Sequence, residues 1–195
     1  MTDILLTLIS TALINNFLLQ WPLGVDPMVQ ATREPATERR QVHALGIATT
    51  GLMLLSGVLG YAAYHWLLIP LGLASLHLLV FLPLSVLLIK PLLSVLAQAL
   101  PPLPFSGLWP LLLGNAGVLG LSLLNLQNDK GFGDHAALSL GAGLGFWLVL
   151  SLFSDLRQRT LNNDVPLPFR GLPIDLISAG LIAVAFLSFS GLIKT

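Results

Sequence analysis

The sequence has no cysteine and few charged residues. Only 9% of its 195 residues are Asp, Glu, Lys or Arg, whereas an ordinary soluble domain has about 25%. The absence of cysteine excludes disulfides, thiolate chemistry and any iron or zinc site whose ligands are all cysteines of this chain. Nine basic residues balance nine acidic residues, so the chain has no net positive charge to attract nucleic acid.

Apolar residues dominate the composition instead. They make up 55% of the chain, and the mean hydropathy is +0.86. A single globule of this length leaves much of its surface in water and cannot bury so much apolar area. Strands of a membrane β-barrel would alternate in segments of about ten residues, and the sequence has no such segments. The composition therefore predicts an all-α integral membrane protein.

Six apolar stretches are long enough to cross a bilayer, which takes about 20 residues of helix. The N-terminus lacks the basic region of a signal peptide, so we expect the first stretch to be retained. The predicted transmembrane helices cover residues 4–23, 43–64, 66–89, 103–126, 135–154 and 172–193.

The basic residues predict the orientation. If the chain crosses the membrane six times, seven of the nine basic residues fall on one side and only Lys130 and Lys194 fall on the other. Because cytoplasmic loops are enriched in Lys and Arg, we expect a multi-pass protein of the bacterial inner membrane with both termini in the periplasm. The seven are Arg33, Arg39, Arg40, Lys90, Arg157, Arg159 and Arg170.

The sequence divides into two weakly similar halves, about 1–97 and 98–195. His43-Ala44 begins the second predicted span and His135-Ala136 begins the fifth, while Asn115 in the second half corresponds to Asn15-Asn16 in the first. Three spans are an odd number, so the second half would cross the membrane in the opposite direction. The alternative is chance similarity among leucine-rich helices. We predict one membrane domain of two inverted three-helix repeats.

Asparagines lie deep inside the first span of each half. Asn15, Asn16 and Asn115 are each about 12 residues from a membrane face, or roughly 18 Å at helical rise. Amides at that depth need partners that hydrocarbon cannot supply. Gly and Pro residues nearby, such as Gly114 and Pro22, predict broken or re-entrant helices. The alternative is that these amides only tie helices together.

Other polar and small residues suggest structural roles. No His pair has the spacing of metal ligands, so we expect no metal site, and no catalytic motif is present. Asp175 is expected at a helix start near the membrane boundary. Small residues four apart predict close helix packing; they are Gly46 with Thr50, Gly141 with Gly145, and Ala179 with Ala183.

Several segments resemble one family of membrane proteins over nearly the whole chain. They begin with MTDILL at residues 1–6 and LINNF at 13–17, and include LGIATT at 45–50 and VLG at 118–120. The resemblance is strongest in DVPLPFRG at 164–171 and continues through LISAGL at 176–181. In these segments the chain is similar to the RnfA, RnfE, NqrD and NqrE subunits of Rnf and Nqr electron-transport complexes, and most similar to the A type.

The resemblance implies a six-helix subunit paired with a related, RnfE-like subunit of opposite topology, together with the other Rnf-type subunits. It also implies a shared 2Fe-2S cluster inside the membrane, to which each subunit gives one cysteine from each broken helix. Such complexes couple electron transfer to the movement of sodium ions or protons, and this subunit would not be catalytic by itself.

The sequence departs from the family at both cysteine positions, where it has Asp26 and Ala116. An aspartate oxygen is a weak substitute for thiolate and an alanine methyl cannot bind iron, so we expect no bound cofactor and no such cluster. We predict a divergent Rnf-type membrane subunit. The alternatives are a scaffolding subunit, or a stand-alone transporter or channel with its ion path at Asn15, Asn16, Asp26 and Asn115. An interfacial position is a further alternative for Asp26.

Overall fold

The computed structural model describes residues 2–14, 16, 27, 29–30, 39–127, 131–161 and 165–190. All regular elements in these ranges are helical, which confirms the predicted all-α class. The elements are α1 (Thr2–Ile9), the π-helical η1 (Ser10–Ile14), α4 (Arg39–Ala63), the π-helical η2 (Tyr64–Leu68), the 3-10 helix η3 (Ala74–Leu76), α5 (His77–Ala99), α6 (Trp109–Leu113), α7 (Ala116–Gln127), α8 (Phe132–Leu161), the 3-10 helix η4 (Leu167–Phe169) and α9 (Leu172–Ser190).

Three described helices are long and apolar enough to cross a membrane. They cover Arg39–Leu68, Ala74–Ala99 and Phe132–Thr160. Shorter apolar helices cover Ile4–Leu13, Trp109–Asn125 and Leu172–Ser188, so each of the six predicted stretches contains an apolar helix. Beyond η1, the first predicted span lies outside the described residues except for Asn16.

The predicted boundary between the second and third spans was wrong. The sequence placed it near His65, whereas the helix continues to Leu68 and the next one begins at Ala74. The turn contains Gly72, whose φ of 69° lies in the left-handed region that glycine adopts without strain. The residues on both sides of His65 are apolar, so hydropathy did not show where the turn between the two helices lies. The third span also continues to Ala99, past its predicted end at residue 89.

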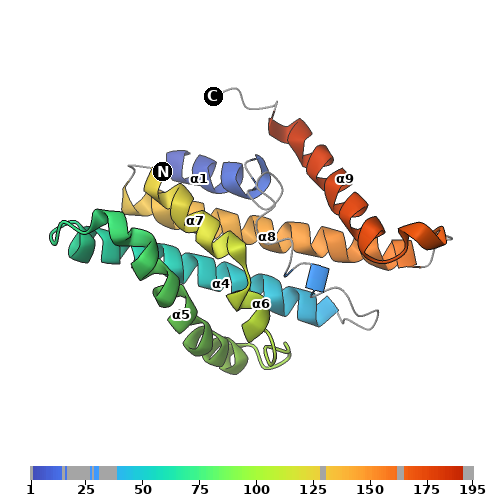
Figure 1. Ribbon diagram of the computed structural model, residues 1–195, viewed down its shortest axis with the longest axis horizontal. Helices are drawn as coiled ribbons and strands as arrows, with labels where there is room; N and C mark the ends of the chain where they lie inside the picture. The colour runs from blue at the N-terminus through green and yellow to red at the C-terminus, as the bar shows by residue number, and fades with distance from the viewer. Residues whose placement is uncertain are drawn as a thin grey trace.

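Helices α4 and α8 lie side by side and form the centre of the molecule (Figure 1). A Cβ atom at Gly143 of α8 would lie 2.6 Å from the Cα of Thr50 of α4. Gly46 of α4 is similarly covered by the ring of Trp147. Glycines thus bring the two backbones close together, as the pairing of Gly46 with Thr50 predicted.

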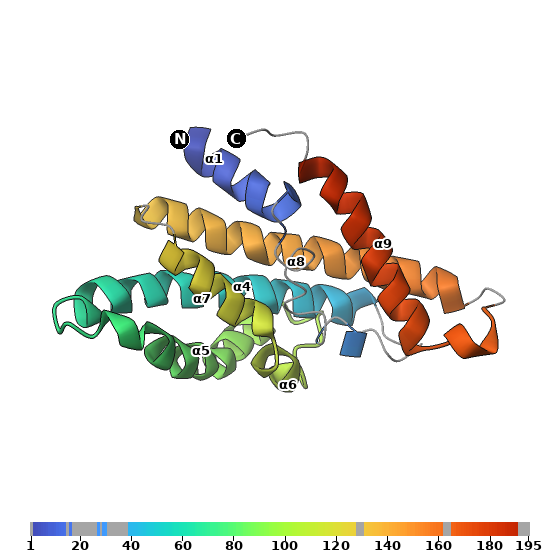
Figure 2. The same cartoon turned by 45° about the horizontal axis from the view of Figure 1, so that its top comes forward.

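The outer helices pack on this central pair. Figure 2 shows α1 against α8. A Cβ atom at Gly141 of α8 would lie 2.7 Å from the carbonyl oxygen of Leu8 in α1. A Cβ atom at Gly145 would lie 2.8 Å from the carbonyl oxygen of Ala12 in η1. The predicted packing at Gly141 and Gly145 is therefore confirmed. Helices α5 and α7 pack on α4, and α9 packs on α8.

The core lies mainly between α4 and α8, and the outer faces of the peripheral helices are apolar. Leu79 and Leu87 of α5 and Leu181 and Val184 of α9 are all more than half exposed. Apolar faces of this extent suit lipid rather than water. The fully buried aromatic rings are Phe146 and Phe153 of α8.

The helices alternate in direction along the chain (Figure 1). By their colours, α1, α5 and α8 run from left to right, whereas α4, α7 and α9 run from right to left. Any six helices that alternate in direction have this arrangement, so the inverted repeat itself stays a prediction. The division of the chain at residues 97 and 98 stays a prediction.

Candidate functional site

The fourth apolar stretch is interrupted between α6 and α7. Gly114 ends α6, and its N–H donates to the Pro110 carbonyl at 3.0 Å. Asn115 then caps α7, because its Oδ1 accepts the N–H of Gly117 at 2.9 Å. Its carbonyl also accepts the N–H of Val118 at 3.1 Å. The predicted break in this helix is therefore present at Asn115.

The Nδ2 atom of the Asn115 amide has no hydrogen-bond partner among the described residues. The residue is only 3% exposed, and Nδ2 forms no hydrogen bond with any described residue. A buried amide donor without an acceptor costs about 1–3 kcal/mol. Ser122, two turns further along α7, and Thr49 of α4 also have buried, unpartnered hydroxyl groups among the described residues. Helices α4 and α7, which pack together, thus contain polar groups with unused hydrogen-bonding capacity.

In the first half, Asn16 is buried at the far end of η1, with 2% of its surface exposed. Its Nδ2 donates to the Ala12 carbonyl at 3.0 Å. A Cβ atom at Gly145 of α8 would lie 2.8 Å from the same Nδ2, so this glycine makes room for the amide. Asn15 and Asp26 lie outside the described residues.

Asn16 and Asn115 have different hydrogen-bond partners: the Asn16 amide donates to the Ala12 carbonyl, and the Asn115 amide accepts the N–H of Gly117. Asn16 contacts α8, whereas Asn115 lies at the break of α6 and α7, both of which pack on α4. The central pair α4 and α8 therefore connects the two positions. A direct meeting of both broken helices stays a prediction, because residues 17–26 lie outside the described part of the chain.

The described residues do not offer the ligands of an iron-sulfur cluster. Ala116, where the family resemblance implies a cysteine, is the exposed first residue of α7, and its methyl group has no electron pair to donate. No group of three or more His, Asp or Glu residues in the described ranges could hold a metal ion. The residues present therefore do not fit the cluster, and its absence from the assembled complex stays a prediction.

An aromatic and imidazole cluster lies at the end of the molecule where α4 meets α5. The Tyr61 ring stacks on His65 with centroids 4.1 Å apart, and it lies 4.8 Å from the ring of His135. His135 Nδ1 is 3.0 Å from Asn125 Oδ1. Sequence reasoning gave these histidines no role, because no spacing along the chain indicates that α4, α7 and α8 bring them together.

A buried ion pair joins α8 to α9. Arg157 Nη2 lies 3.1 Å from Asp175 Oδ2, and the two side chains are 10% and 5% exposed. Asp175 is in the first turn of α9, as predicted for a helix start. Its partner was missed, because nothing in the sequence showed which residue of α8 would face it.

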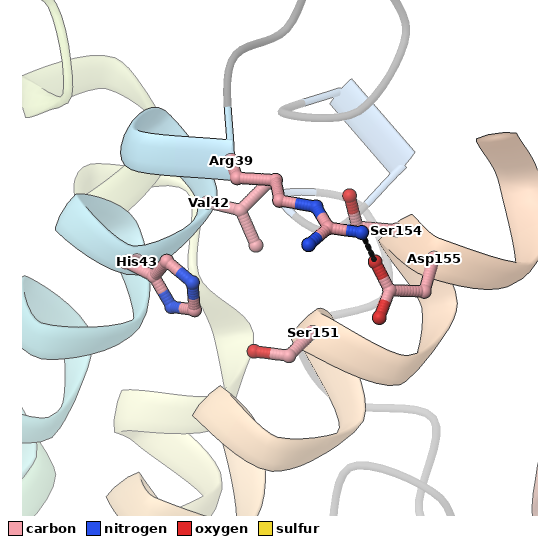
Figure 3. Close-up of a pocket in the computed structure, with 6 residues that line it drawn as sticks. All are labelled: Arg39, Val42, His43, Ser151, Ser154 and Asp155. Carbon is pink, nitrogen blue, oxygen red and sulfur yellow. Dashed lines mark ion pairs between the residues drawn. The ribbon is translucent and has the colours of Figure 1, made fainter.

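A small cavity lies between the beginning of α4 and the end of α8 (Figure 3). Its volume is about 60 Å³, whereas pockets for small molecules have roughly 300–1,000 Å³. Arg39 and Asp155 form an exposed ion pair of 3.4 Å at its edge. His43 accepts a hydrogen bond of 3.1 Å from Trp147 Nε1. The cavity is therefore too small for a substrate, and its side chains join α4 to α8.

Comparison with known proteins identifies the family. Residues 4–193 match the family described as Rnf-Nqr subunit, membrane protein. The chain is 41% identical to the A-type subunit of the ion-translocating oxidoreductase complex of Thioalkalivibrio sulfidiphilus and 40% identical to the protein of that name in Tolumonas auensis. It is 38% identical to that of Edwardsiella ictaluri, and all three matches cover both chains completely. The chain therefore belongs to the Rnf-Nqr family of multi-pass membrane subunits.

Proposed function

We propose that this protein is the A-type membrane subunit of an ion-translocating oxidoreductase complex in the bacterial inner membrane, with both termini in the periplasm. Its full-length relatives carry that name. It works with a related, RnfE-like membrane subunit of opposite topology and is not catalytic alone.

The observation that carries this proposal is the broken helix at Asn115. In transport proteins built from inverted repeats, discontinuous helices near the midplane supply free backbone groups for ions and substrates. Here the break combines a capped α7 with a buried amide donor that has no partner in the described chain. An unsatisfied donor within a span is costly, and an ion's ligand shell, water or a second subunit would satisfy it.

The packing of the outer helices supports two inverted halves. Helix α1 packs on α8, the central helix of the other half, and α7 packs on α4, again the central helix of the other half. Helices α5 and α9 each pack on the central helix of their own half. Exchanging the two halves therefore reproduces these four helix pairs, as a two-fold pseudosymmetry axis between α4 and α8 would require.

We place the polar path through this protein at Asn15, Asn16, Asp26 and Asn115. Asn16 and Asn115 support this placement, because both are almost completely buried on or beside the central helices. Since the chain has no cysteine, this subunit contributes no thiolate ligand to a cluster, and electrons pass through other carriers of the complex.

Purification of the tagged, full-length chain under mild detergent tests the proposal. We expect a related membrane protein and flavin- or iron-containing subunits to co-purify with it. A chain that purifies alone and conducts a solute in liposomes would instead be a stand-alone transporter. Iron analysis of the same preparation tests the missing cluster, and a stoichiometric 2Fe-2S signal from the two paired membrane subunits would contradict it.

A further inference from the structure

A second cavity lies away from Asn115, between the end of α8 and the beginning of α9. Its volume is about 240 Å³. Arg157 and Thr160 of α8 line one side, and Arg170 and Asp175 line the other. Neither the proposed ion path nor the broken helix uses this cavity.

Among the described residues that line the cavity, the charges leave one unpaired cation, that of Arg170. Arg157 and Asp175 neutralise each other across 3.1 Å, and Arg157 Nη1 also lies within hydrogen-bonding distance of the Val29 carbonyl, at 3.3 Å. Arg170 is exposed and forms no ion pair with any described residue. Its Nε donates to the Val165 carbonyl at 2.8 Å, which holds the guanidinium beside the cavity. Neither terminal nitrogen has a hydrogen bond to a residue in the described ranges.

The backbone adds to this positive potential. Gly171 follows Arg170 with a φ of 79° and directs the chain into α9, which begins at Leu172. The first N–H groups of a helix have no acceptors within the helix and carry a partial positive charge. In α9 these groups belong to Leu172 and Ile174, because Pro173 has no N–H and the Asp175 N–H donates to the Gly171 carbonyl at 3.2 Å. The open end of α9 therefore lies next to the Arg170 guanidinium, and both favour an anion.

The segment that contains Arg170 also carries large exposed apolar side chains, which do not themselves line the cavity. Leu167 is 77% exposed and Phe169 is 50% exposed in η4, while Leu172 is 52% exposed at the beginning of α9. These side chains flank Arg170 in the sequence. This segment, at the end of two apolar helices, combines exposed leucine and phenylalanine side chains with a guanidinium. Such a combination is expected at the boundary between lipid headgroups and acyl chains.

We propose that this cavity binds the phosphate of an anionic phospholipid headgroup. The Arg170 guanidinium contacts the phosphate oxygens, and the open end of α9 supplies further positive potential. The acyl chains lie along Leu167, Phe169 and Leu172. Basic pockets between transmembrane helices at the cytoplasmic side bind such headgroups, and the predicted orientation places Arg157, Arg159 and Arg170 on that side.

A phospholipid explains both the guanidinium and the exposed apolar side chains of the site, whereas a soluble phosphate explains only the guanidinium. Free phosphate would use the guanidinium but would leave the apolar side chains in water. An acidic segment of another subunit would also pair with Arg170, and a comparison of added ligands separates these possibilities.

The test measures the melting temperature of the purified full-length chain in detergent, with added phosphatidylglycerol, phosphatidylcholine or inorganic phosphate. We expect phosphatidylglycerol to raise the melting temperature and the other two to have little effect. Arg170→Gln should weaken the apparent affinity for phosphatidylglycerol at least about tenfold, because it removes charge-assisted hydrogen bonds. Arg159→Gln is the matched control, since Arg159 is exposed at the same end of α8 but does not line the cavity.

Four results would overturn the proposal. An equal shift with phosphatidylcholine would show that the headgroup charge is not recognised, and an equal shift with inorganic phosphate would indicate a soluble anion. An equal loss in Arg159→Gln and Arg170→Gln would indicate general surface attraction. If no lipid shifts the wild-type chain and Arg170→Gln instead releases a co-purifying subunit, the cavity binds a protein partner. The wild-type comparison of the three ligands remains decisive even if Arg170→Gln folds poorly.

Discussion

Gly143 of α8 lies directly against Thr50 of α4, so that a Cβ atom on the glycine would be 2.6 Å from the Thr50 Cα. A backbone atom occupies that position, and it cannot rotate away as a side chain could. The closeness of the two central helices therefore depends on the missing side chain at residue 143.

We expect Gly143→Ala to destabilise the protein by about 1–3 kcal/mol, because the added methyl must push α4 and α8 apart. Gly180→Ala in α9 is the matched control, since no heavy atom lies within 4 Å of the corresponding Cβ. Thermal unfolding in detergent measures both variants. Equal stability of Gly143→Ala and the wild type would show that α4 and α8 leave room for a methyl group between residue 143 and Thr50.

Arg157 and Asp175 should also be strongly coupled. Arg157→Met leaves a buried carboxylate without its counterion, which costs about 3–5 kcal/mol, whereas the double change Arg157→Met with Asp175→Leu should recover most of that loss. Arg39→Met is the control, because the Arg39–Asp155 pair is exposed and worth less than about 1 kcal/mol. A double-mutant cycle of unfolding free energies checks the coupling, and additive losses at residues 157 and 175 would refute it.

The orientation can be tested directly, because the chain has no cysteine of its own. Gly131→Cys introduces a thiol at an exposed position where a Cβ meets no other atom within 4 Å, and Arg159→Cys introduces one at the exposed other end of α8. A membrane-impermeant maleimide should label residue 131 in intact cells. It should label residue 159 only after the inner membrane is opened, and the reverse pattern would contradict periplasmic termini.

Features set by local sequence could be predicted. The apolar stretches were visible from composition, and the break at Asn115 was visible because Gly114 and the capping amide are adjacent in the chain. The glycine contacts of α4 and α8 also followed from small residues spaced one helical turn apart.

Features that depend on packing between helices could not be predicted. The turn at Gly72 was misplaced because Trp66, Leu67 and Leu68 are as apolar as the residues that follow them, and hydropathy does not separate two spans within one apolar run. The Arg157–Asp175 pair depends on how α8 and α9 face each other. The contact of His135 with Asn125 likewise depends on the packing of α7 and α8.

The proposed function depends on the Asn115 amide acting in the working complex rather than only capping a helix. Serine also caps helices well but lacks the costly unpartnered amide donor, so the isolated Asn115→Ser chain should be as stable as the wild type or more stable. Asn115→Ala should lose the cap, which is worth about 1 kcal/mol. Both variants should assemble with the partner subunits.

The decisive measurement is therefore the electron-transfer turnover of the purified complex containing Asn115→Ser, beside the wild-type complex. We expect normal assembly with turnover reduced about tenfold, which corresponds to the loss of one hydrogen bond of about 1.4 kcal/mol. Normal assembly with unchanged turnover would contradict the proposed role and would leave Asn115 a purely structural cap.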